Sequence, residues 1–503
     1  MKIKVLVANR GEIACRILRA CTEAGLSTVA ICAPNDRGTL FTELADEVVM
    51  LEGTTVSETY LDQAQILEAA RQTGARAVHP GFGFLSERAD FAQAVMDASL
   101  TWIGPSPRAI ERMGDKMTAR QTMRAAGVPV IPGEEVEEED ERLALEALRN
   151  ASTRVGYPLL LKASSGGGGK GMRAVHEPSG FDQAAMAARR EAVAAFGDGR
   201  IYIERLLSGS KHIEIQILAD QHGRTIHLGE RECSVQRRHQ KVFEEAPGPT
   251  ITSDIRHAMG QAAVAAAQAV DYVGAGTVEF LLAPSGEFFF LEMNTRIQVE
   301  HPVTELVTGV DIVREQLRIA QGEPMSCTDA VIRGHAIEVR LYAEDASNGF
   351  LPVIGPLLVF RPPEGPGIRL DTGVREGDDV TPNYDPMLAK LIVWAPSRHE
   401  ALQKMRRALD DFVVLGTTTN LMFLRELCDQ EDVVAGTTTT TTIDDAWPNG
   451  WKSTGTERGE QASLLLAASA EAWGMHRQQH GLLSSEPNGG PPSPFTTVAR
   501  RFP

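Results

Sequence analysis

The sequence predicts a mixed α/β protein of several domains, with a parallel sheet near the N-terminus and a β-rich region towards the C-terminus. Residues 2–110 alternate short apolar runs with helix-like segments, a βαβ rhythm that is typical of a parallel sheet. After about residue 330 the pattern becomes rich in strands, such as HAIEVRLYAE and LAKLIVWA. A chain of 503 residues has room for about three domains of ~150 residues each.

The first region reads as strands that alternate with helices. The expected strands are IKVLVAN, STVAICA, ARAVHPG and LTWIG. Helices are expected over 12–24, near 60–73 and near 88–98, and a further helix over 115–126 is ended by GVPVIPG.

The middle region combines a glycine loop, several strands and a hairpin. The acidic run EEVEEEDE, 134–141, is expected to open an exposed helix, and another helix is expected over 180–196. The expected strands are YPLLLKAS, IYIERLL, HIEIQILAD and RTIHLGERE. GTVEFLLAPSGEFFFLEMN reads as a hairpin that turns at Pro284-Ser285.

The last part of the chain differs in composition from the rest. After the strand LLVFRPP and a helix over 397–410, six consecutive threonines occupy 437–442. A stretch rich in Gly, Ser and Pro follows and contains one Ala/Leu-rich segment, 461–473. This composition predicts a poorly packed tail or the start of another domain.

Composition and charge exclude several classes of partner. Net charge is −17, from 50 basic and 67 acidic residues, and no basic stretch stands out, so nucleic acid and anionic membranes are not expected as partners. The six cysteines form no CxxC pair, which favours reduced thiols in a cytosol. The N-terminal MKIKVLVANRGEIA lacks a signal-peptide core, and QAAVAAAQAV (261–270) is too short to span a bilayer. We therefore expect a soluble, cytoplasmic protein.

The segment EMNTRIQVEHPVTE, 292–305, places polar side chains in an unusual order. Glu292, Asn294, Arg296, Gln298 and Glu300 all occupy even positions, so an extended strand would present them on one face. A solvated sheet face is the ordinary explanation of such alternation. The preceding FFFL run is, however, typical of a strand buried on both faces, and this favours the floor of a site.

The loop SSGGGGKG, 164–171, suits the binding of a polyphosphate. Glycine has no Cβ, so backbone amides can approach phosphate closely, although a flexible loop remains the alternative. The loop matches neither GxxxxGK[ST] nor GxGxxG. Lys162 ends the preceding strand and Lys116 opens an earlier helix.

The hairpin also predicts a metal site. A turn centred between Pro284 and Ser285 sets Glu279 opposite position 290 and diagonal to Glu292, where neighbours lie about 7–8 Å apart. Two bare carboxylates at that distance repel, and Mg²⁺ relieves the repulsion. Asn294 is a further oxygen ligand, and two exposed glutamates are the structural alternative.

Eight motifs in order give the chain a family resemblance. They are NRGEIA (9–14), HPGFGFLSE (79–87), MGDK (113–116), KASSGGGGKGM (162–172), ECSVQRRHQK (232–241), EMNTRIQVEHPVTE (292–305), GHAIEVRLYAED (334–345) and PNYDPMLAKL (382–391). Across about residues 1–440 the chain resembles the biotin carboxylase family of ATP-grasp enzymes, the ATP-dependent component of acyl-CoA carboxylases.

The resemblance implies a role for each matching residue. For ATP these residues are Lys116, Lys162, Gly167, Gly168, Gly169, Glu204, Leu207, His212, Gln236 and His239. For two Mg²⁺ or Mn²⁺ ions they are Glu279, Glu292 and Asn294. For bicarbonate they are Lys241, Arg296, Gln298, Val299 and Glu300, and for biotin they are Phe82 and Arg340. The resemblance makes Lys241, Arg296, Glu300 and Arg340 catalytic.

The same resemblance implies a mechanism and a domain organisation. Glu300 is the base for bicarbonate, carboxyphosphate is the intermediate, and Arg340 faces the biotin ureido oxygen. The implied fold is a Rossmann-like N-terminal domain (1–113), an ATP-grasp domain (114–325) with a lid over about 131–203, and a β-rich C-terminal domain (326–442). A tail occupies 443–503.

Some positions depart from the family pattern. Phe82 replaces the usual tyrosine, Arg88 the usual asparagine and Arg205 a common lysine, and the first two changes are expected to weaken biotin positioning. No AMKM-type biotinylation motif is present, so biotin is expected on a separate carrier protein. The implied partners are a biotin carboxyl carrier protein, carboxyltransferase subunits and a second copy of the chain.

Two other functions are compatible with parts of this pattern. Another ATP-grasp ligase, such as a purine-pathway carboxylase or a carboxylate–amine ligase, would share the fold and the metal carboxylates but would not need HPGFGFLSE or RIQVEH. A catalytically silent scaffold subunit would show decay among the charged site residues, and none is seen.

Overall fold

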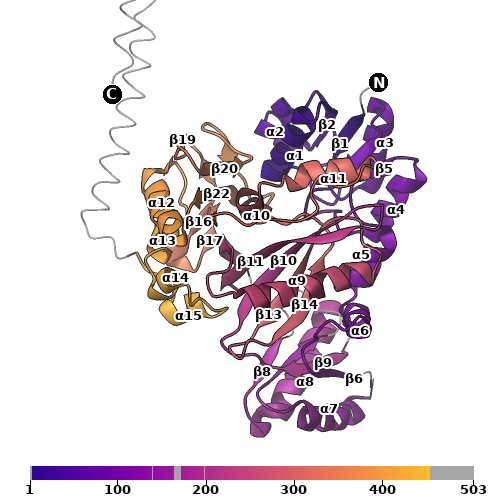
Figure 1. The fold of residues 1–503 in the computed structure, drawn as a ribbon, viewed down its shortest axis with the longest axis vertical. Coiled ribbons are helices and arrows are strands. Elements are labelled where there is room, and N and C mark those ends of the chain that lie inside the picture. The colour runs from indigo at the N-terminus through magenta and orange to yellow at the C-terminus, as the bar shows by residue number, and fades with distance from the viewer. Residues whose placement is uncertain are drawn as a thin grey trace, which may run out of the picture. The chain divides into compact units, whose positions relative to one another are not determined.

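The N-terminal region, which is indigo to violet in Figure 1, forms a five-stranded sheet in the order β3-β2-β1-β4-β5. All four neighbouring pairs are parallel, which confirms the predicted parallel sheet. The computed structural model describes residues 3–453 apart from 137, 139, 164–171, 198 and 239. The elements of this region are β1 (Lys4–Val7), α1 (Gly11–Glu23), β2 (Ser27–Cys32), η1 (Pro34–Asp36), α2 (Leu40–Leu44), β3 (Glu47–Met50), α3 (Gln63–Thr73), β4 (Ala77–His79), α4 (Ala89–Asp97), β5 (Thr101–Trp102), α5 (Pro107–Gly114) and α6 (Lys116–Ala125).

A smaller four-stranded sheet, in the order β6-β9-β7-β8, follows with two helices packed on it (Figure 1, bottom). Its elements are β6 (Gly133–Val136), α7 (Glu141–Val155), β7 (Leu159–Ala163), β8 (Arg173–Val175), η2 (Pro178–Gly180), α8 (Phe181–Phe196) and β9 (Ile201–Arg205). The expectation that the acidic run opens a helix was wrong for its first residues. Residues 133–136 pair with β9 instead, and the helix starts only at Glu141, where the Asp140 side chain accepts two backbone N–H bonds.

An eight-stranded antiparallel sheet forms the centre of the molecule and crosses the predicted border at residue 325. Its order is β14-β13-β10-β11-β12-β15-β22-β20. The strands are β10 (Lys211–Ala219), β11 (Thr225–Arg237), β12 (Gln240–Ala246), β13 (Gly274–Leu282), β14 (Phe288–Asn294), β15 (His335–Tyr342), β20 (Ile368–Thr372) and β22 (Met387–Ala395). Because β12 pairs with β15, charged residues of the middle and C-terminal regions share one sheet face.

Helices cover both faces of this sheet, so polar residues on it are buried. On β10, Ile213, Ile215 and Ile217 pack with α9 (Ser253–Gln268), and farther along the sheet α12 (Arg398–Asp411) packs on the same side. The opposite face carries Glu214 and Gln216, which are fully buried. Farther along, α10 (His301–Thr308) packs on this face against β12, β15 and β22. We call this second surface the site face and the first the far face.

Three β-bulges decide which side chains reach the site face. A bulge in β14 between Phe290 and Glu292 puts Phe290 into the far-face core and Glu292 beside Glu279. A second bulge, in β12 between Lys241 and Phe243, does the same for Lys241, which shares the site face with Glu244 although an even alternation would separate them, and a third lies in β11 between Glu232 and Val235. Bulges next to active sites re-aim side chains in this way.

The strand that carries Glu292 ends at Asn294, so the expected polar strand row over 292–300 was wrong beyond that residue. Residues 295–300 form a connection to α10, which starts at His301 with Pro302 in its first turn. Ile297 points away into the N-terminal core and is fully buried there. Arg296, Gln298 and Glu300 are therefore positioned by a loop.

The packed chain continues beyond residue 442, where the tail was expected to start. Ile443 and Trp451 belong to the C-terminal core, and the Trp451 indole N–H donates to Glu426 at 2.9 Å. The described residues up to Trp451 form one compact unit. The segment 461–473 lies outside the described residues. The other elements are α11 (Ile312–Ala320), β16 (Glu344–Asp345), η3 (Ala346–Asn348), β17 (Leu351–Pro352), β18 (Gly355–Pro356), β19 (Val359–Arg361), β21 (Asp379–Val380), β23 (Val413–Leu415), α13 (Leu421–Leu427), α14 (Glu431–Ala435) and α15 (Thr442–Ala446).

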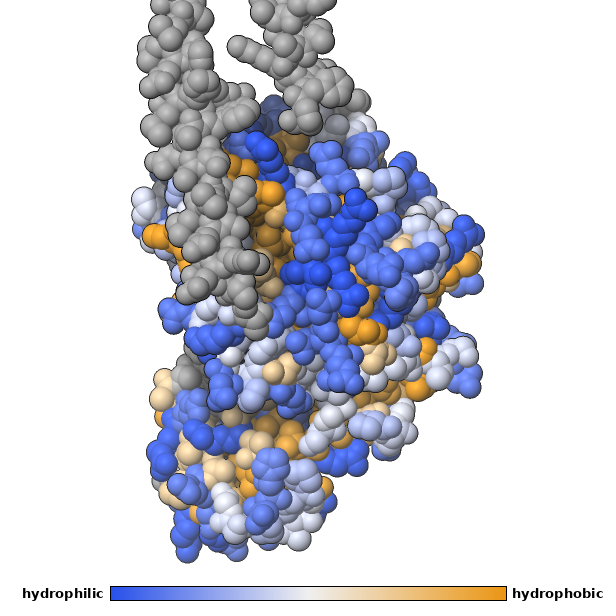
Figure 2. Space-filling view, turned by 90° about the vertical axis from the view of Figure 1, so that its left-hand side faces the viewer, coloured by the Kyte–Doolittle hydropathy of each residue, from blue (hydrophilic) through white to orange (hydrophobic). Residues whose placement is uncertain are grey.

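The surface is mostly hydrophilic on the face that Figure 2 shows, where hydrophobic residues are scattered in small groups. Among the described residues, no helix combines the length and the apolar character needed to cross a bilayer.

Candidate active site

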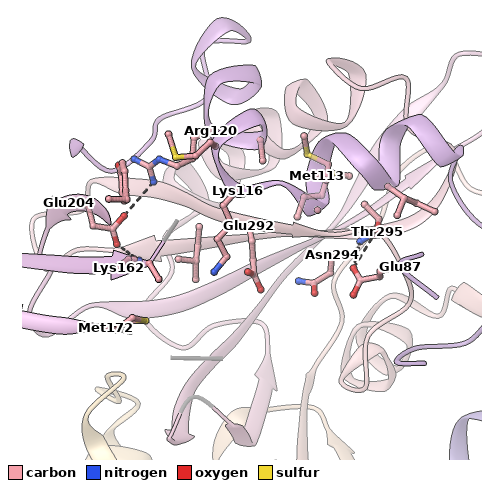
Figure 3. Close-up of a pocket in the computed structure, with 18 residues that line it drawn as sticks. Glu87, Met113, Lys116, Arg120, Lys162, Met172, Glu204, Glu292, Asn294 and Thr295 are labelled. Atoms are coloured by element: carbon pink, nitrogen blue, oxygen red, sulfur yellow. Dashed lines mark hydrogen bonds and ion pairs between the residues drawn. The ribbon is translucent and has the colours of Figure 1, made fainter. Parts of the chain in front are cut away.

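A cleft of about 270 Å³ lies between the helices α5 and α6, strand β14 and the small sheet (Figure 3). Lys116, the first residue of α6, enters it from the helices and points towards Glu292 on β14. Asn294 and Thr295 line one end, and Lys162 lines the other with Glu204. The cleft therefore brings together cations and carboxylates from distant parts of the chain, with Glu87, Lys116, Lys162, Glu204 and Glu292 among its lining residues.

The end of the cleft near the small sheet holds two of the residues predicted for ATP, Lys162 and Glu204. Lys162 on β7 forms an ion pair with Glu204 on β9, and the Arg120 guanidinium lies 3.5 Å from the same carboxylate. Two ammonium groups, Lys116 and Lys162, thus face the cleft, and cations of this kind bind phosphate oxygens. Arg120 was missed by the sequence analysis because nothing in its helix distinguishes it from a surface arginine.

The remaining residues predicted for ATP are placed less directly. Leu207 follows β9, is half-buried, and its carbonyl accepts from the Ser210 hydroxyl at 3.1 Å. Gln236 lies opposite Lys241 in the sheet register, and its side-chain amide donates to the Cys233 carbonyl. Gly167, Gly168, Gly169 and His239 lie outside the described residues.

Glu279 and Glu292 lie directly opposite each other on β13 and β14, and not diagonally as predicted. The β14 bulge accounts for the difference. The Glu279 carboxylate and burial together raise the pKa of Glu292, whose side chain opens into the cleft. A divalent cation would relieve this repulsion, since Mg²⁺ prefers carboxylate and amide oxygens. The residues present therefore fit the predicted metal site.

Asn294 and His212 also contact Glu279. The Asn294 amide donates to Glu279 at 2.7 Å, and its oxygen accepts from Arg296 at 2.9 Å. His212 lies 3.0 Å from Glu279 on the other side. Glu214, which the sequence analysis missed, brings a ligand atom within 4.8 Å of those of His212 and Glu279. Its even position in HIEIQILAD, shared with His212, was the available signal.

Lys241 is the centre of the buried charges. Its ammonium group lies 2.7 Å from Glu300 and 3.0 Å from Glu279, and it also contacts Glu214. Burial lowers the pKa of Lys241, but Glu279 and Glu300 outweigh that effect and raise it. The predicted catalytic pair Lys241 and Glu300 is therefore brought into contact, with both groups charged.

Glu300 also contacts Arg340, which comes from β15 across the sheet. The Arg340 guanidinium donates to Glu300 at 3.0 Å and to Glu244 at 2.6 Å. Burial raises the pKa of Glu300, but Lys241 and Arg340 outweigh it and hold the pKa well below its usual range. Glu300 is thus a carboxylate at neutral pH, the form that a general base requires.

Arg296 is held from the N-terminal region. Its guanidinium donates to Glu87 at 2.8 Å, and the Thr295 backbone N–H donates to the other Glu87 oxygen at 3.1 Å. Glu87 ends the motif HPGFGFLSE. Its role was not predicted, because the contact joins residues 209 positions apart.

Arg231 is a further residue that sequence reasoning missed. It is fully buried, and its guanidinium donates to Glu214 at 3.1 Å and to the Gln298 oxygen at 2.7 Å. The Gln298 amide in turn donates to Glu279 at 2.8 Å. Arg231 therefore fixes the predicted bicarbonate residue Gln298 between two carboxylates.

Phe82 lies in the N-terminal region. It is half-buried, packs against the core there, and its carbonyl accepts from the Asn9 side chain at 2.8 Å. Arg88, the other departure in this motif, pairs with Asp90 at the surface. The phenylalanine offers an apolar edge where a tyrosine would offer a hydroxyl.

Three known domain families match successive parts of the chain. Residues 1–110 match the biotin carboxylase N-terminal domain, and residues 338–445 match the biotin carboxylase C-terminal domain. Residues 115–328 match the ATP-binding domain of the carbamoyl-phosphate synthase L chain.

Whole proteins match as well. A biotin carboxylase from Nostoc sp. is 50% identical over 442 residues, which cover 88% of this chain and 98% of the relative. The mitochondrial methylcrotonoyl-CoA carboxylase subunit alpha of Oryza sativa is 48% identical over 475 residues, which cover 92% of this chain. This chain spans 64% of the length of the rice subunit.

Solved structures share the fold. A biotin carboxylase complex from Campylobacter jejuni has a TM-score of 0.83 at 39% identity, with 88% of this chain and 98% of that chain covered. The biotin carboxylase domain dimer of the Hydrogenobacter thermophilus 2-oxoglutarate carboxylase, solved with MgADP, ADP and bicarbonate, has a TM-score of 0.83 at 42% identity. That likeness covers 89% of this chain and 98% of the other.

Proposed function

The chain belongs to the biotin carboxylase family and is an ATP-dependent ligase, and from this premise we propose how its own residues divide the carboxylation of biotin. The observation that carries the proposal is the shared position of Lys241, which contacts Glu300 at 2.7 Å and Glu279 at 3.0 Å. One ammonium group thereby joins the predicted base to the predicted metal ligand. An anion that replaces one of these two contacts of Lys241 would lie between Glu300 and Glu279.

The first half-reaction activates bicarbonate. Glu300 takes the bicarbonate proton while a bicarbonate oxygen attacks the γ-phosphorus of ATP, the bond to the bridging oxygen breaks, and ADP leaves. Lys116 and Lys162 neutralise charge on the phosphates, which is the main way of accelerating phosphoryl transfer. The Glu300 carboxylate becomes more basic when Lys241 turns from it to the substrate.

The metal and the lid support this step. When bound, Mg²⁺ or Mn²⁺ held by Glu279, Glu292 and Asn294 supplies further positive charge to the transferring phosphoryl group. The proposed lid, about 131–203, contains all of the small sheet except the last residues of β9, and it contributes Lys162, Met172 and Tyr202 to one wall of the cleft. A closed wall protects carboxyphosphate from water.

The second half-reaction uses Arg340. Carboxyphosphate breaks its C–O bond to give CO₂ and phosphate, and the phosphate takes the proton from biotin N1′. Arg340 stabilises the negative charge that develops on the ureido oxygen, and the nitrogen then attacks CO₂. The Arg340 guanidinium lies 3.0 Å from Glu300. The residues proposed for the two half-reactions are therefore neighbours, which supports this role.

The partners follow from the chemistry and the relatives. Biotin reaches the site on a carrier outside these 503 residues, and a carboxyltransferase subunit receives the carboxyl group for an acyl-CoA. We propose a homodimer, which the dimeric solved relative supports. We keep the domain borders given above at 113 and 325, and extend the C-terminal domain to Trp451, which packs in its core. We place the protein in the cytoplasm, where its six free thiols stay reduced.

The test is a bicarbonate-dependent ATPase assay with Mg²⁺ in bicarbonate-depleted buffer. Bicarbonate should stimulate phosphate release, and free biotin should stimulate it further. Lys241→Met should lose the stimulation. Lys404→Met is the matched control, because Lys404 donates to the backbone carbonyls of Pro366 and Trp394 away from the site. Equal rates with and without bicarbonate in the parent protein would refute the function.

Intact-mass measurement tests the carrier. After co-expression with a biotin ligase, the chain should show no biotin adduct, and an adduct would contradict a separate carrier.

A further inference from the structure

Two of the motifs contain charged residues to which the proposed function gives no role. NRGEIA contains Glu12 and PNYDPMLAKL contains Lys390, and both are buried. The Lys390 ammonium group lies 3.2 Å from the Glu12 carboxylate, so the two motifs meet in one ion pair. A fully buried lysine is uncommon and requires a partner and a reason.

Lys390 lies next to the candidate active site. It is on β22, directly opposite Arg340 of β15 in the sheet register. Its ammonium group also donates to the backbone carbonyl of Val299 at 2.9 Å. Val299 belongs to the loop between β14 and α10, whose neighbouring residues Gln298 and Glu300 line the proposed bicarbonate pocket.

The loop is therefore held at three successive residues. Arg231 holds the Gln298 side chain at 2.7 Å, and Lys241 holds the Glu300 side chain at 2.7 Å. Both of these contacts involve groups that face the reacting molecules. The contact from Lys390 differs from these two because it is made to a backbone carbonyl. From β22, it fixes the main chain at Val299, between Gln298 and Glu300.

We propose that Lys390 is a positioning residue for bicarbonate, which holds the Val299 carbonyl and thereby fixes the turn that carries Gln298 and Glu300. The inference rests on the proposed function. A charged donor suits this task, because hydrogen bonds from charged groups are shorter and stronger than those from neutral ones.

Charged neighbours keep Lys390 in place. Asp371 of β20 lies 3.7 Å from the ammonium group and is itself held by Arg369 at 2.7 Å. Arg369 continues to Glu305 on α10 at 2.7 Å. Burial lowers the pKa of Lys390, but Glu12 and Asp371 outweigh it, so the group stays charged. The ion pairs thus connect α1, β22, β20 and α10 behind the bicarbonate loop.

The test uses a double variant, Glu12→Gln/Lys390→Met, because removing Lys390 alone would leave a buried carboxylate without its partner. The KM for bicarbonate in bicarbonate-dependent ATP cleavage should rise roughly 10- to 100-fold, the scale expected when reacting groups are misplaced. The KM for ATP should stay within about three-fold of the parent, since the removed contact does not bind nucleotide. Lys390→Arg, which keeps a charged donor, should give an intermediate bicarbonate KM.

Lys404→Met is again the matched control, since it removes a lysine that also donates to a carbonyl of β22. It should keep the parent's bicarbonate KM. If the first double variant does not fold, Glu12→Gln/Lys390→Gln replaces it and must show the same selective rise. A parallel rise of both KM values, or an unchanged bicarbonate KM in a folded double variant, overturns the proposal.

A second measurement does not depend on activity. Amide hydrogen exchange of residues 297–303 should speed up in the double variant while exchange in α9 stays at the parent level. In the parent, the His301 and Val303 amides donate to the Gln298 and Glu300 carbonyls in this turn. If the parent shows no bicarbonate-dependent ATP cleavage, the proposed function fails, and unchanged exchange in this segment would separately refute the role of Lys390.

Discussion

The two faces of β12 and β15 both carry buried charges but use them differently. On the far face, both Glu245 oxygens have donors: His335 at 2.7 Å and Arg398 at 2.7 and 3.0 Å. On the site face, Lys241 divides its ammonium group among three carboxylates. There Glu338 has no hydrogen-bond donor on either oxygen within the described part of the chain.

The comparison separates charges that stabilise from charges that await a substrate. A carboxylate with all its donors in place gains from its low-dielectric surroundings, whereas partly satisfied polar groups cost free energy. Proteins retain such destabilising groups at sites where their function requires them. A substitution of Glu245 on the far face should therefore lower stability without changing activity, whereas substitutions of the reacting groups on the site face should lower activity.

The largest expected effect comes from Glu300→Gln on the site face. The amide keeps the shape of the side chain but removes the base, which is typically worth about 10²–10⁴-fold. Bicarbonate-dependent ATP cleavage and biotin carboxylation should fall together by that factor, as measured by phosphate release and by capture of labelled bicarbonate into biotin. The free energy of unfolding should also fall, because Lys241 and Arg340 hold the pKa of Glu300 well below its usual range and both lose a charged partner. A variant that retains either activity within a few-fold would show that Glu300 is not the base.

Arg340→Ala should have a large effect on one half-reaction only. It removes a cation aimed at the biotin oxygen, and one such donor is worth about 10²–10³-fold. Carboxybiotin formation should fall by that factor, while bicarbonate-dependent ATP cleavage without biotin stays within several-fold of the parent. The residual ATP-cleavage effect has a physical source, because Arg340 also lowers the pKa of Glu300. If both activities disappear in parallel, the division of roles is wrong.

Glu245→Gln on the far face should act on stability and leave the chemistry intact. Burial raises the pKa of Glu245, but its bonds from His335 and Arg398 outweigh this and lower it. Hydrogen bonds to a charged group are worth about 1.5–3 kcal/mol each, so the free energy of unfolding at pH 7 should fall by about that amount. Activity per folded molecule should not change.

The stability difference between the parent and Glu245→Gln depends on pH, and its direction follows from the lowered pKa of Glu245. A carboxyl with a lowered folded pKa contributes stability above its unfolded pKa of about 4.3, and that contribution is lost as pH falls through the folded value. Denaturant unfolding of parent and variant should therefore differ equally at pH 7 and pH 5 and converge at lower pH. A difference that grows on acidification would contradict the pairing.

Local sequence patterns predicted much of this molecule. The βαβ alternation of residues 2–110 gave the parallel sheet, because strand and helix periods are local properties. The motifs likewise pointed to Lys116, Lys162 and Glu292, which line one cleft. Pairing between distant strands was not predictable in this way. The sheet crosses the border expected at residue 325 because β12 pairs with β15, about 90 residues later.

The errors in the site have the same origin. An even alternation set Glu279 diagonal to Glu292, and a bulge moved the two into direct opposition. Bulges insert one residue without changing the polar pattern around them, so periodicity does not reveal them. Arg231 and Glu87 were missed because their roles depend on contacts with Gln298 and Arg296, which are distant from them in sequence.

The smallest effect is expected from Glu338→Gln, and it sharpens the comparison within the site face itself. Glu338 lies opposite Glu244 on the neighbouring strand and is fully buried. Burial raises the pKa of Glu338 well above its usual range, with Glu244 and Glu300 adding to it against Lys390 and Arg340. The raised pKa favours the protonated, uncharged form of this side chain.

Glutamine has nearly the same shape and the same lack of charge as this protonated side chain, so the substitution should change little. Both half-reactions should stay within about three-fold of the parent, and the free energy of unfolding within about 1 kcal/mol, because no hydrogen bond or ion pair is removed. Glu300→Gln, made on the same face with the same chemical change, is the control that shows the assay can detect a lost carboxylate. A loss of more than about ten-fold in Glu338→Gln would show that the ionised form is used, and Glu338 would then belong with Glu300 among the groups that exchange protons during turnover.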